Sequence, residues 1–190
     1  HAADGYYRAS GKMALAICTS GPGATNFITG LYTAQIDSMP LIAITGNADT
    51  TQFGKEAFQC VPIAEIARPV VKASYCVTKP DDVVKILQEA FHVARKRRPG
   101  PVLIDLPLDV QLAEIGYKPM SYEPLSWEKP EPDIQKIDVA LDMIVAAKEP
   151  VIIMGGGVIL ADACDELREF AEYMALPVVT TYMAKGGLPE

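Results

Sequence analysis

The residues best suited to binding chemistry in this chain lie in the segment 19–26, which reads Thr-Ser-Gly-Pro-Gly-Ala-Thr-Asn. An apolar run precedes the segment and a helical pattern follows it, which predicts a buried strand, a tight turn and a helix that begins near Pro22. Gly21 and Gly23 would let a ligand approach the backbone closely, and the helix start offers unpaired N–H groups. Asn26 adds a side-chain amide. The segment is a candidate ligand site, although a purely structural strand–helix connection would have the same pattern.

A second glycine segment, Gly155-Gly156-Gly157, follows the apolar run 150–154 and precedes a predicted helix over 161–175 and a strand over 177–181. This strand–glycine–helix–strand order is typical of sites for nucleotide cofactors. The glycines do not match G-x-G-x-x-G, so the standard NAD fingerprint is not supported. A simple tight turn remains the alternative.

Composition excludes several classes of function. The 190 residues carry a net charge of −7 without a basic stripe, so we expect no nucleic-acid partner. We expect no signal peptide, and no apolar run in the sequence is long enough to span a bilayer, so we expect no membrane association. The four cysteines have no C-x-x-C spacing and no nearby histidines, which argues against a metal site or a disulfide framework and favours a reducing cytoplasm.

The elements that would position these residues alternate between strands and helices, which predicts a doubly wound parallel α/β sheet. Asp105 lies within a predicted strand and is expected to be a hydrogen-bonded structural acid rather than a general base. The expected strands of the first part are 13–18, 41–45, 70–77 and 102–106, and the expected helices are 24–37 and 81–97.

A proline-rich stretch divides the chain. Four prolines within 119–132 interrupt the alternation, so we expect a first domain over 1–118, an extended linker over 119–133 and a second α/β domain over 134–190, which starts with a helix over 134–147. Because the chain begins at His1 without a methionine and stops just after a strand, we expect it to be a fragment of a longer protein.

Five segments, taken together and in this order, resemble the thiamine-diphosphate enzymes related to acetolactate synthase. The resemblance implies that 1–118 is most of the pyrimidine-binding domain and that 134–190 begins the central domain that holds FAD. It also implies that the domain for the diphosphate and Mg²⁺ lies outside this chain. The five segments are 1–6, 19–26, 37–46, 57–59 and 98–107.

The resemblance implies roles for particular residues. Pro22 and Asn26 would line the aminopyrimidine ring of thiamine diphosphate, and Gly21 and Gly23 would allow its close approach. Gln59 would lie beside the cofactor and substrate as a catalytic residue, although a solvated loop residue is the default interpretation of its polar surroundings. The remaining implied contacts are Phe58 as an aromatic wall near Gln59, Arg98 on FAD, Gly155, Gly156 and Gly157 under the flavin nucleotide, and Thr181, Tyr182 and Met183 against the flavin.

The implied reaction begins at a glutamate that would lie five residues before His1, outside this chain. In most members it promotes formation of the thiazolium ylid, which attacks a 2-oxo acid; CO₂ leaves, and the remaining enamine adds to a second carbonyl. The cofactor does the difficult chemistry and the protein supplies binding and electrostatics. The full protein would be a homodimer or homotetramer with its active site between subunits, so the isolated chain should show no turnover.

Leu108 bears on the substrate. Acetolactate synthases usually carry a lysine after the Asp-Leu-Pro segment, whereas the apolar Leu108 resembles glyoxylate carboligases, which also carry valine in place of the glutamate. The turn 20–26, in contrast, is more similar to the acetolactate synthase version. Glyoxylate is therefore the preferred expected substrate, with pyruvate and an acetolactate synthase large subunit as the alternative. A non-catalytic flavin- or nucleotide-binding module is the third possibility.

Overall fold

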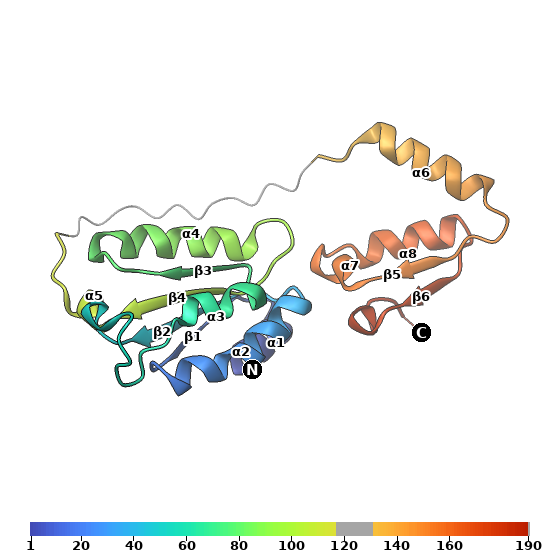
Figure 1. Cartoon of the computed structure of the whole chain (residues 1–190). Helices are drawn as coiled ribbons and strands as arrows, with labels where there is room; N and C mark the ends of the chain where they lie inside the picture. Colours follow the sequence, from blue (N-terminus) through green and yellow to red (C-terminus); the bar gives the residue numbers. More distant parts are fainter. Residues whose placement is uncertain (117–130, 190) are drawn as a thin grey trace. The chain divides into compact units, whose positions relative to one another are not determined.

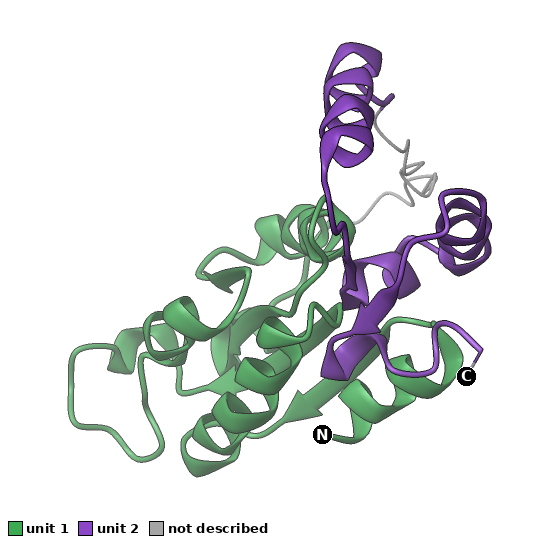
Figure 2. Cartoon of the chain, turned by 90° about the vertical axis from the view of Figure 1, so that its right-hand side faces the viewer, with its two compact units in different colours: residues 1–127 green, residues 128–190 purple. Residues whose placement is uncertain are grey.

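The computed structural model describes residues 1–116 and 131–189. The chain forms two compact units, 1–127 and 128–190, each described by itself below (Figure 2). The predicted linker over 119–133 falls outside the described residues except for its last three positions, so its conformation remains a prediction.

The first unit is built on a four-stranded sheet in the order β1-β2-β4-β3, and every pair in it is parallel. In the register, Ile42 of β2 lies between Leu15 of β1 and Val102 of β4. All four strands therefore end at one edge of the sheet, which is where loops carry sites in open parallel sheets. The strands are β1 Ala14–Cys18, β2 Leu41–Asn47, β3 Ala73–Cys76 and β4 Val102–Pro107.

Helices cover both faces of this sheet, as the doubly wound prediction requires (Figure 1). Helix α4 packs on the face that carries Ile42 and Ile104, and its Ala90 and Ala94 are fully buried there. Helix α3 lies on the opposite face, where the Ser74 hydroxyl donates to the Ala64 carbonyl at 2.7 Å. The helices are α1 Ala2–Ser10, α2 Pro22–Ile36, α3 Ile63–Ala67, α4 Val83–Arg95 and α5 Leu108–Leu112, with short 3₁₀ turns η1 Thr50–Gln52, η2 Arg68–Val70 and η3 Pro80–Asp82.

The second unit has a small parallel sheet of two strands, β5 and β6, in which Ile153 lies opposite Val179. Met154 of β5 is almost fully buried, whereas Ile153 points to the other face and is exposed. The elements are α6 Ile134–Ala146, β5 Ile152–Met154, α7 Gly156–Leu160, α8 Cys164–Tyr173, β6 Val178–Thr180 and η4 Tyr182–Ala184.

Two expected elements are wrong in their bounds. The helix expected over 161–175 is the shorter α8, because Asp162, with φ of 55°, separates it from the additional helix α7. The strand expected over 70–77 begins only at Ala73, because Pro69 lies in the 3₁₀ turn η2. The other expected strands and helices agree with the structure within two residues at each end.

Candidate active site

The turn after β1 is shaped by its two glycines. Gly21 is the N-cap of α2 with φ of 60°, and Pro22 occupies the first helical position as predicted. A Cβ on Gly21 would lie 2.8 Å from the Cβ of Gln59, and one on Gly23 would lie 2.6 Å from a methyl carbon of Thr19. Both glycines therefore make room for neighbouring parts of the chain itself.

Helix α2 presents two of the predicted cofactor residues on one exposed face. Pro22 and Asn26 are four positions apart, which is about one helical turn, and both side chains are exposed. An exposed amide can bind a polar heteroaromatic ring, because both the amide and the ring have hydrogen-bond donors and acceptors. The described residues thus fit the role that the resemblance gives to this turn.

Gln59 is held against the glycine turn. Its backbone has φ of 56°, and the Ser20 hydroxyl donates to its Oε1 at 3.2 Å. The residue is half-buried, so the default interpretation of a solvated loop residue does not describe it. Its neighbour Phe58 is 88% exposed. The structure therefore brings Gln59 and Gly21 together, as a shared site requires.

Beside this turn, a row of polar side chains crosses the sheet near the ends of its strands. The register aligns Cys18, Thr45, Asp105 and Cys76, one from each strand. Asp105 is only 1% exposed, and its carboxylate accepts from the Thr45 hydroxyl at 2.7 Å and from the Asn47 amide at 2.6 Å. Asp105 is therefore buried and hydrogen-bonded as predicted, and its role as a structural acid rather than a general base stays a prediction.

Burial governs the ionisation of this row. It raises the pKa of the Asp105 carboxyl, while hydrogen bonds from Asn47, Thr45 and Cys76 act in the opposite direction. Burial and the nearby Asp105 together raise the pKa of the Cys76 thiol to about 11. The same two causes raise the pKa of the Cys18 thiol. Both thiols are therefore poor nucleophiles at neutral pH, and no cysteine chemistry is assigned to them.

The loops at this edge are joined to one another through Asn47 and Asp109. Besides its bond to Asp105, the Asn47 amide donates to the Val61 carbonyl at 2.9 Å, and its own oxygen accepts from the Ala48 N–H at 2.9 Å. Asp109 accepts from both the backbone N–H and the hydroxyl of Thr50. Sequence reasoning missed Asn47; the available signal was an amide that ends an otherwise apolar strand.

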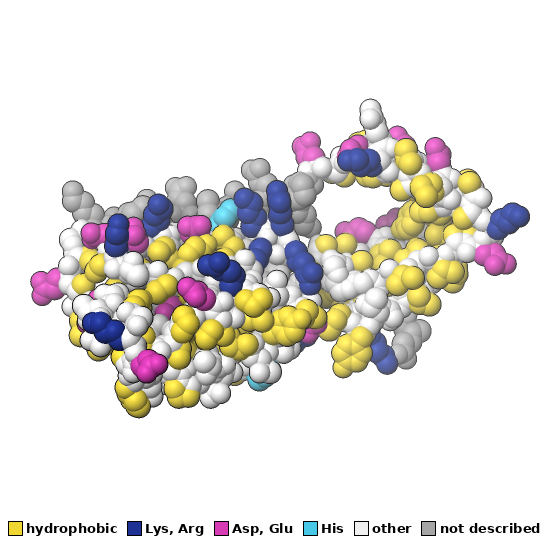
Figure 3. Space-filling view, viewed as in Figure 1, with side chains coloured by type: hydrophobic (Ala, Val, Ile, Leu, Met, Phe, Trp, Pro, Cys, Tyr) yellow, Lys and Arg dark blue, Asp and Glu magenta, His cyan; other side chains and the backbone are white. Residues whose placement is uncertain are grey.

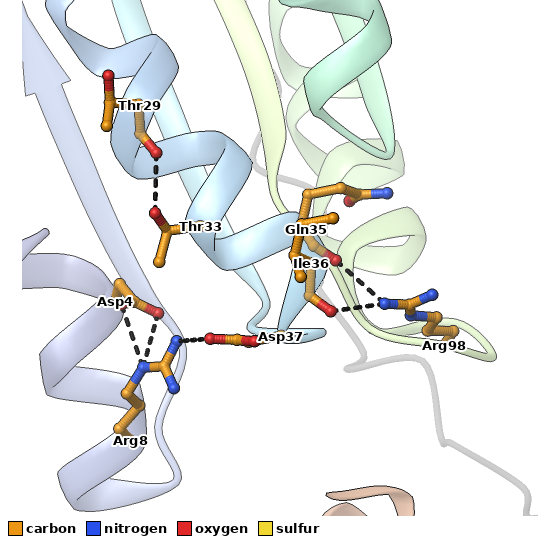
Figure 4. A network of polar contacts seen from close by, with 8 residues as sticks. All are labelled: Asp4, Arg8, Thr29, Thr33, Gln35, Ile36, Asp37 and Arg98. Carbon is orange, nitrogen blue, oxygen red and sulfur yellow. Dashed lines mark hydrogen bonds and ion pairs between the residues drawn. The ribbon is translucent and has the colours of Figure 1, made fainter. Parts of the chain in front are cut away.

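Arg98 lies at the other edge of the sheet, just before β4 begins. Its guanidinium donates to the Ser38 hydroxyl at 2.7 Å and to the Ile36 carbonyl at 2.7 Å, so it caps the carboxyl end of α2 (Figure 4). Because α2 starts at the Gly21 turn and ends here, the structure does not bring Arg98 together with Gln59. The contact of Arg98 with FAD stays a prediction.

In the second unit the two predicted flavin segments meet. Gly155 is the N-cap of α7, while Gly156 and Gly157 are helical, so the expected glycine loop is mostly a helix start. A Cβ on Gly156 would lie 3.1 Å from the Cβ of Met183, which explains the small residue there. Thr181 precedes η4 and the Tyr182 side chain is 93% exposed. The flavin contacts of these segments stay a prediction.

The structure also opens a pocket that the sequence did not predict. It has a volume of about 690 Å³ and lies between α8, β6 and the segment after η4. Its lining includes the cations Arg168 and Lys185 and the apolar Leu176 and Leu188. The signal for it was weak, because its residues come from three separate elements.

Two kinds of feature are absent from the described ranges 1–116 and 131–189. No group of three or more His, Cys, Asp or Glu side chains there could hold a metal ion. No helix there is long and apolar enough to cross a membrane.

Comparison with known proteins decides the family. The family model for the N-terminal TPP-binding domain of thiamine pyrophosphate enzymes matches residues 1–66, and the one for their central domain matches 137–190. The chain belongs to the thiamine pyrophosphate enzyme family. The parallel α/β sheet is consistent with the N-terminal domain of this family.

Relatives of known name match over the whole chain. It is 47% identical to glyoxylate carboligase of Escherichia coli O157:H7, 46% to the acetolactate synthase large subunit of Corynebacterium glutamicum and 44% to acetolactate synthase of Arthrospira platensis. Each match includes the whole of this chain but only 32%, 31% and 34%, respectively, of the length of the relative. The chain therefore spans about a third of their length.

Proposed function

We propose that this chain is part of a thiamine-diphosphate-dependent carboligase that joins two 2-oxo acids with loss of CO₂. The observation that carries the proposal is the meeting of Gln59 with the Gly21 turn beside an exposed Pro22 and Asn26. Family membership supports thiamine diphosphate as a ligand of the protein, and we propose that this cluster contacts its aminopyrimidine ring. When bound, thiamine diphosphate supplies the carbanion chemistry. The residues of this chain orient the ring and present an amide to the substrate.

Glyoxylate is the substrate that we propose first, with tartronate semialdehyde as the product. Support comes from glyoxylate carboligase among the relatives and from Leu108, which is apolar, half-exposed and placed directly after β4 at the edge that carries Gln59. Acetolactate synthesis from pyruvate is the second candidate, because acetolactate synthases match at nearly the same identity. A non-catalytic flavin- or nucleotide-binding module is the third.

The further parts of the proposal concern the other cofactors, the assembly and the compartment. We propose FAD in the second unit at Gly156 and Met183, Mg²⁺ with the diphosphate in a domain outside this chain, and a homodimer or homotetramer. The isolated chain would then be inactive. The compartment that we propose is the cytoplasm, because all four cysteines are free thiols.

The experiment is a substrate panel on the full-length protein, with and without added thiamine diphosphate and FAD. Cofactor-dependent CO₂ release from glyoxylate supports the first candidate, and release from pyruvate alone supports the second. Absence of CO₂ release from both, with a bound flavin, would leave the binding module. Reading the gene at the position five residues before His1 provides an independent check, because valine supports the carboligase and glutamate supports acetolactate synthase.

A further inference from the structure

Asp105 and Asn47 form a link between the core of the sheet and the segment that carries Gln59. The Asp105 carboxylate, at the centre of the sheet, accepts from the Asn47 amide at 2.6 Å. The same amide nitrogen donates to the Val61 carbonyl at 2.9 Å, two residues after Gln59. One side chain therefore connects a buried strand with a loop that closes the site.

The loop needs such an anchor. Residues 53–62, between η1 and α3, contain turns but no helix or strand. Gln59 lies in this loop at φ of 56°, a conformation that residues with a Cβ keep only when their surroundings hold it. The hydrogen bond that the Ser20 hydroxyl donates to Gln59 from outside the loop, at 3.2 Å, is longer than either bond made by the Asn47 amide.

Asp105 is well suited to hold the anchor in place. Its strand is central in the sheet, and Thr45 donates to the second carboxylate oxygen at 2.7 Å, so the carboxylate cannot rotate freely. Because the Asp105 carboxylate keeps one orientation, the Asn47 amide that donates to it keeps one orientation as well. Only in that orientation does the amide nitrogen point at both Asp105 and the Val61 carbonyl. The Ala48 N–H on the amide oxygen selects the same orientation.

We propose that Asp105 and Asn47 are positioning residues, which act through the Val61 carbonyl to hold Gln59 against the Gly21 turn. The inference rests on the proposed function, in which Gln59 lies beside the cofactor and substrate. Neither residue touches a reacting atom. Their effect is on the placement of the Gln59 loop.

The test uses the full-length protein with Asn47→Ala and Asp105→Asn, and Thr45→Val as the matched control. All three variants weaken the same buried carboxylate network, but Thr45 makes no bond to the loop. Hydrogen exchange of the amides in 57–62 should become about 10-fold faster in the first two variants, the scale of one hydrogen bond, whereas Thr45→Val, which keeps the Asn47 bond to the Val61 carbonyl, should change it less. The kcat for CO₂ release should fall about 10- to 100-fold with a smaller change in KM.

Wild-type protection of 57–62 in Asn47→Ala, or equal loss of protection in Thr45→Val, would overturn the inference. Faster exchange with an unchanged kcat would overturn the part of it that concerns Gln59 in turnover. Failure of the proposed function gives a different result, because the wild-type protein would then release no CO₂. The hydrogen-exchange measurement would still decide whether Asn47 anchors the loop.

Discussion

Gly21 has a steric role that can be separated from any role in ligand binding. Its φ of 60° and the 2.8 Å between a Cβ at this position and the Cβ of Gln59 both oppose a side chain. We therefore expect Gly21→Ala to lower the free energy of unfolding by about 1–3 kcal/mol, measured by urea unfolding. Gly5→Ala is the control, because Gly5 lies in α1 with nothing within 4 Å of an added Cβ.

The control should gain stability by about 0.5–1 kcal/mol, since alanine is the better helix residue. If Gly21→Ala were as stable as Gly5→Ala, the close packing of Gln59 on the turn would be contradicted. A drop in stability without any ligand present would show that this glycine is needed by the fold itself.

Asp109 is expected to make the folded state more stable at neutral pH than at low pH. Hydrogen bonds from Thr50 lower the pKa of the Asp109 carboxyl. A lowered pKa in the folded state means that the contribution is present above the unfolded pKa, near 4, and is lost as the pH falls through the lowered folded value. Asp109→Asn should therefore lower the free energy of unfolding at neutral pH and make that free energy fall less steeply with decreasing pH below about pH 4. Urea unfolding at a series of pH values measures both effects.

Thr50→Val is the matched variant for this prediction, because it removes the hydroxyl donor and keeps the carboxyl. Like Asp109→Asn, it should make the free energy of unfolding fall less steeply below about pH 4. Parallel curves for the wild type and both variants would mean that the Thr50–Asp109 contact contributes nothing to folding.

Among the secondary-structure elements, α2 runs from the carboxyl end of β1 to the amino end of β2. It begins at the Gly21 turn and ends where Arg98 donates to the Ile36 and Gln35 carbonyls at 2.7 and 3.4 Å (Figure 4). We expect Arg98→Ala to lower the free energy of unfolding by about 1 kcal/mol in the absence of FAD, because the last carbonyls of α2 lose their donor. Thermal unfolding checks this, with the neighbouring exposed Arg97→Ala as the control.

The same variant tests the flavin contact expected from the resemblance. In the full-length protein, loss of FAD from Arg98→Ala with unchanged stability would contradict the capping role and favour the flavin contact. Loss of stability with FAD retained would favour the cap. Arg98→Lys keeps the charge near the helix end but not the fork that reaches two acceptors at once, so it should rescue stability only in part.

Most elements could be predicted because their signal is local. The strands β2 and β4 are continuous apolar runs, and α2 and α4 are long enough to show helical periodicity. Helices α3 and α5 were missed because five residues contain less than two turns of pattern. The break at Asp162 was missed because a positive φ at a residue other than glycine has little sequence signal.

The site was predicted less completely than the fold. Gly21 and Gln59 could be named from the resemblance, but their direct contact depends on a loop that crosses from η1 to α3. The alignment of Thr45 with Asp105 depends on β2 lying beside β4, and strand order has no local sequence signal. The role of Asn47 follows from that order, so it too required the structure.

At the scale of the molecule, the two units differ in how much apolar surface they bury. Among the described residues, the fully or almost fully buried apolar side chains of the second unit are Met154, Ala171 and Ala184, whereas the first unit buries most of β2 and β4. A two-stranded sheet is marginally stable by itself. We therefore expect the second unit to gain stability from contacts beyond those among its described residues.

The surface of the second unit indicates where such contacts would form. Ile153 and Val179 lie opposite each other on one sheet face and are 73% and 52% exposed. Helix α6 adds Met143 and Val145, at 69% and 72% exposed. Figure 3 shows apolar side chains over this unit, and patches of this kind mark contact sites when they are contiguous.

We therefore expect the 190-residue chain to bind an apolar fluorescent dye and to self-associate with increasing concentration, measured by dye fluorescence and by light scattering. Ile153→Thr with Val179→Thr should reduce both signals, because the pair supplies the central part of the exposed sheet face. Tyr173→Ser is the control: its side chain is 86% exposed but lies on α8 outside that face, so it should change neither signal strongly. Equal reduction by the pair and by the control would contradict a specific apolar face and would mean that exposed apolar residues act singly.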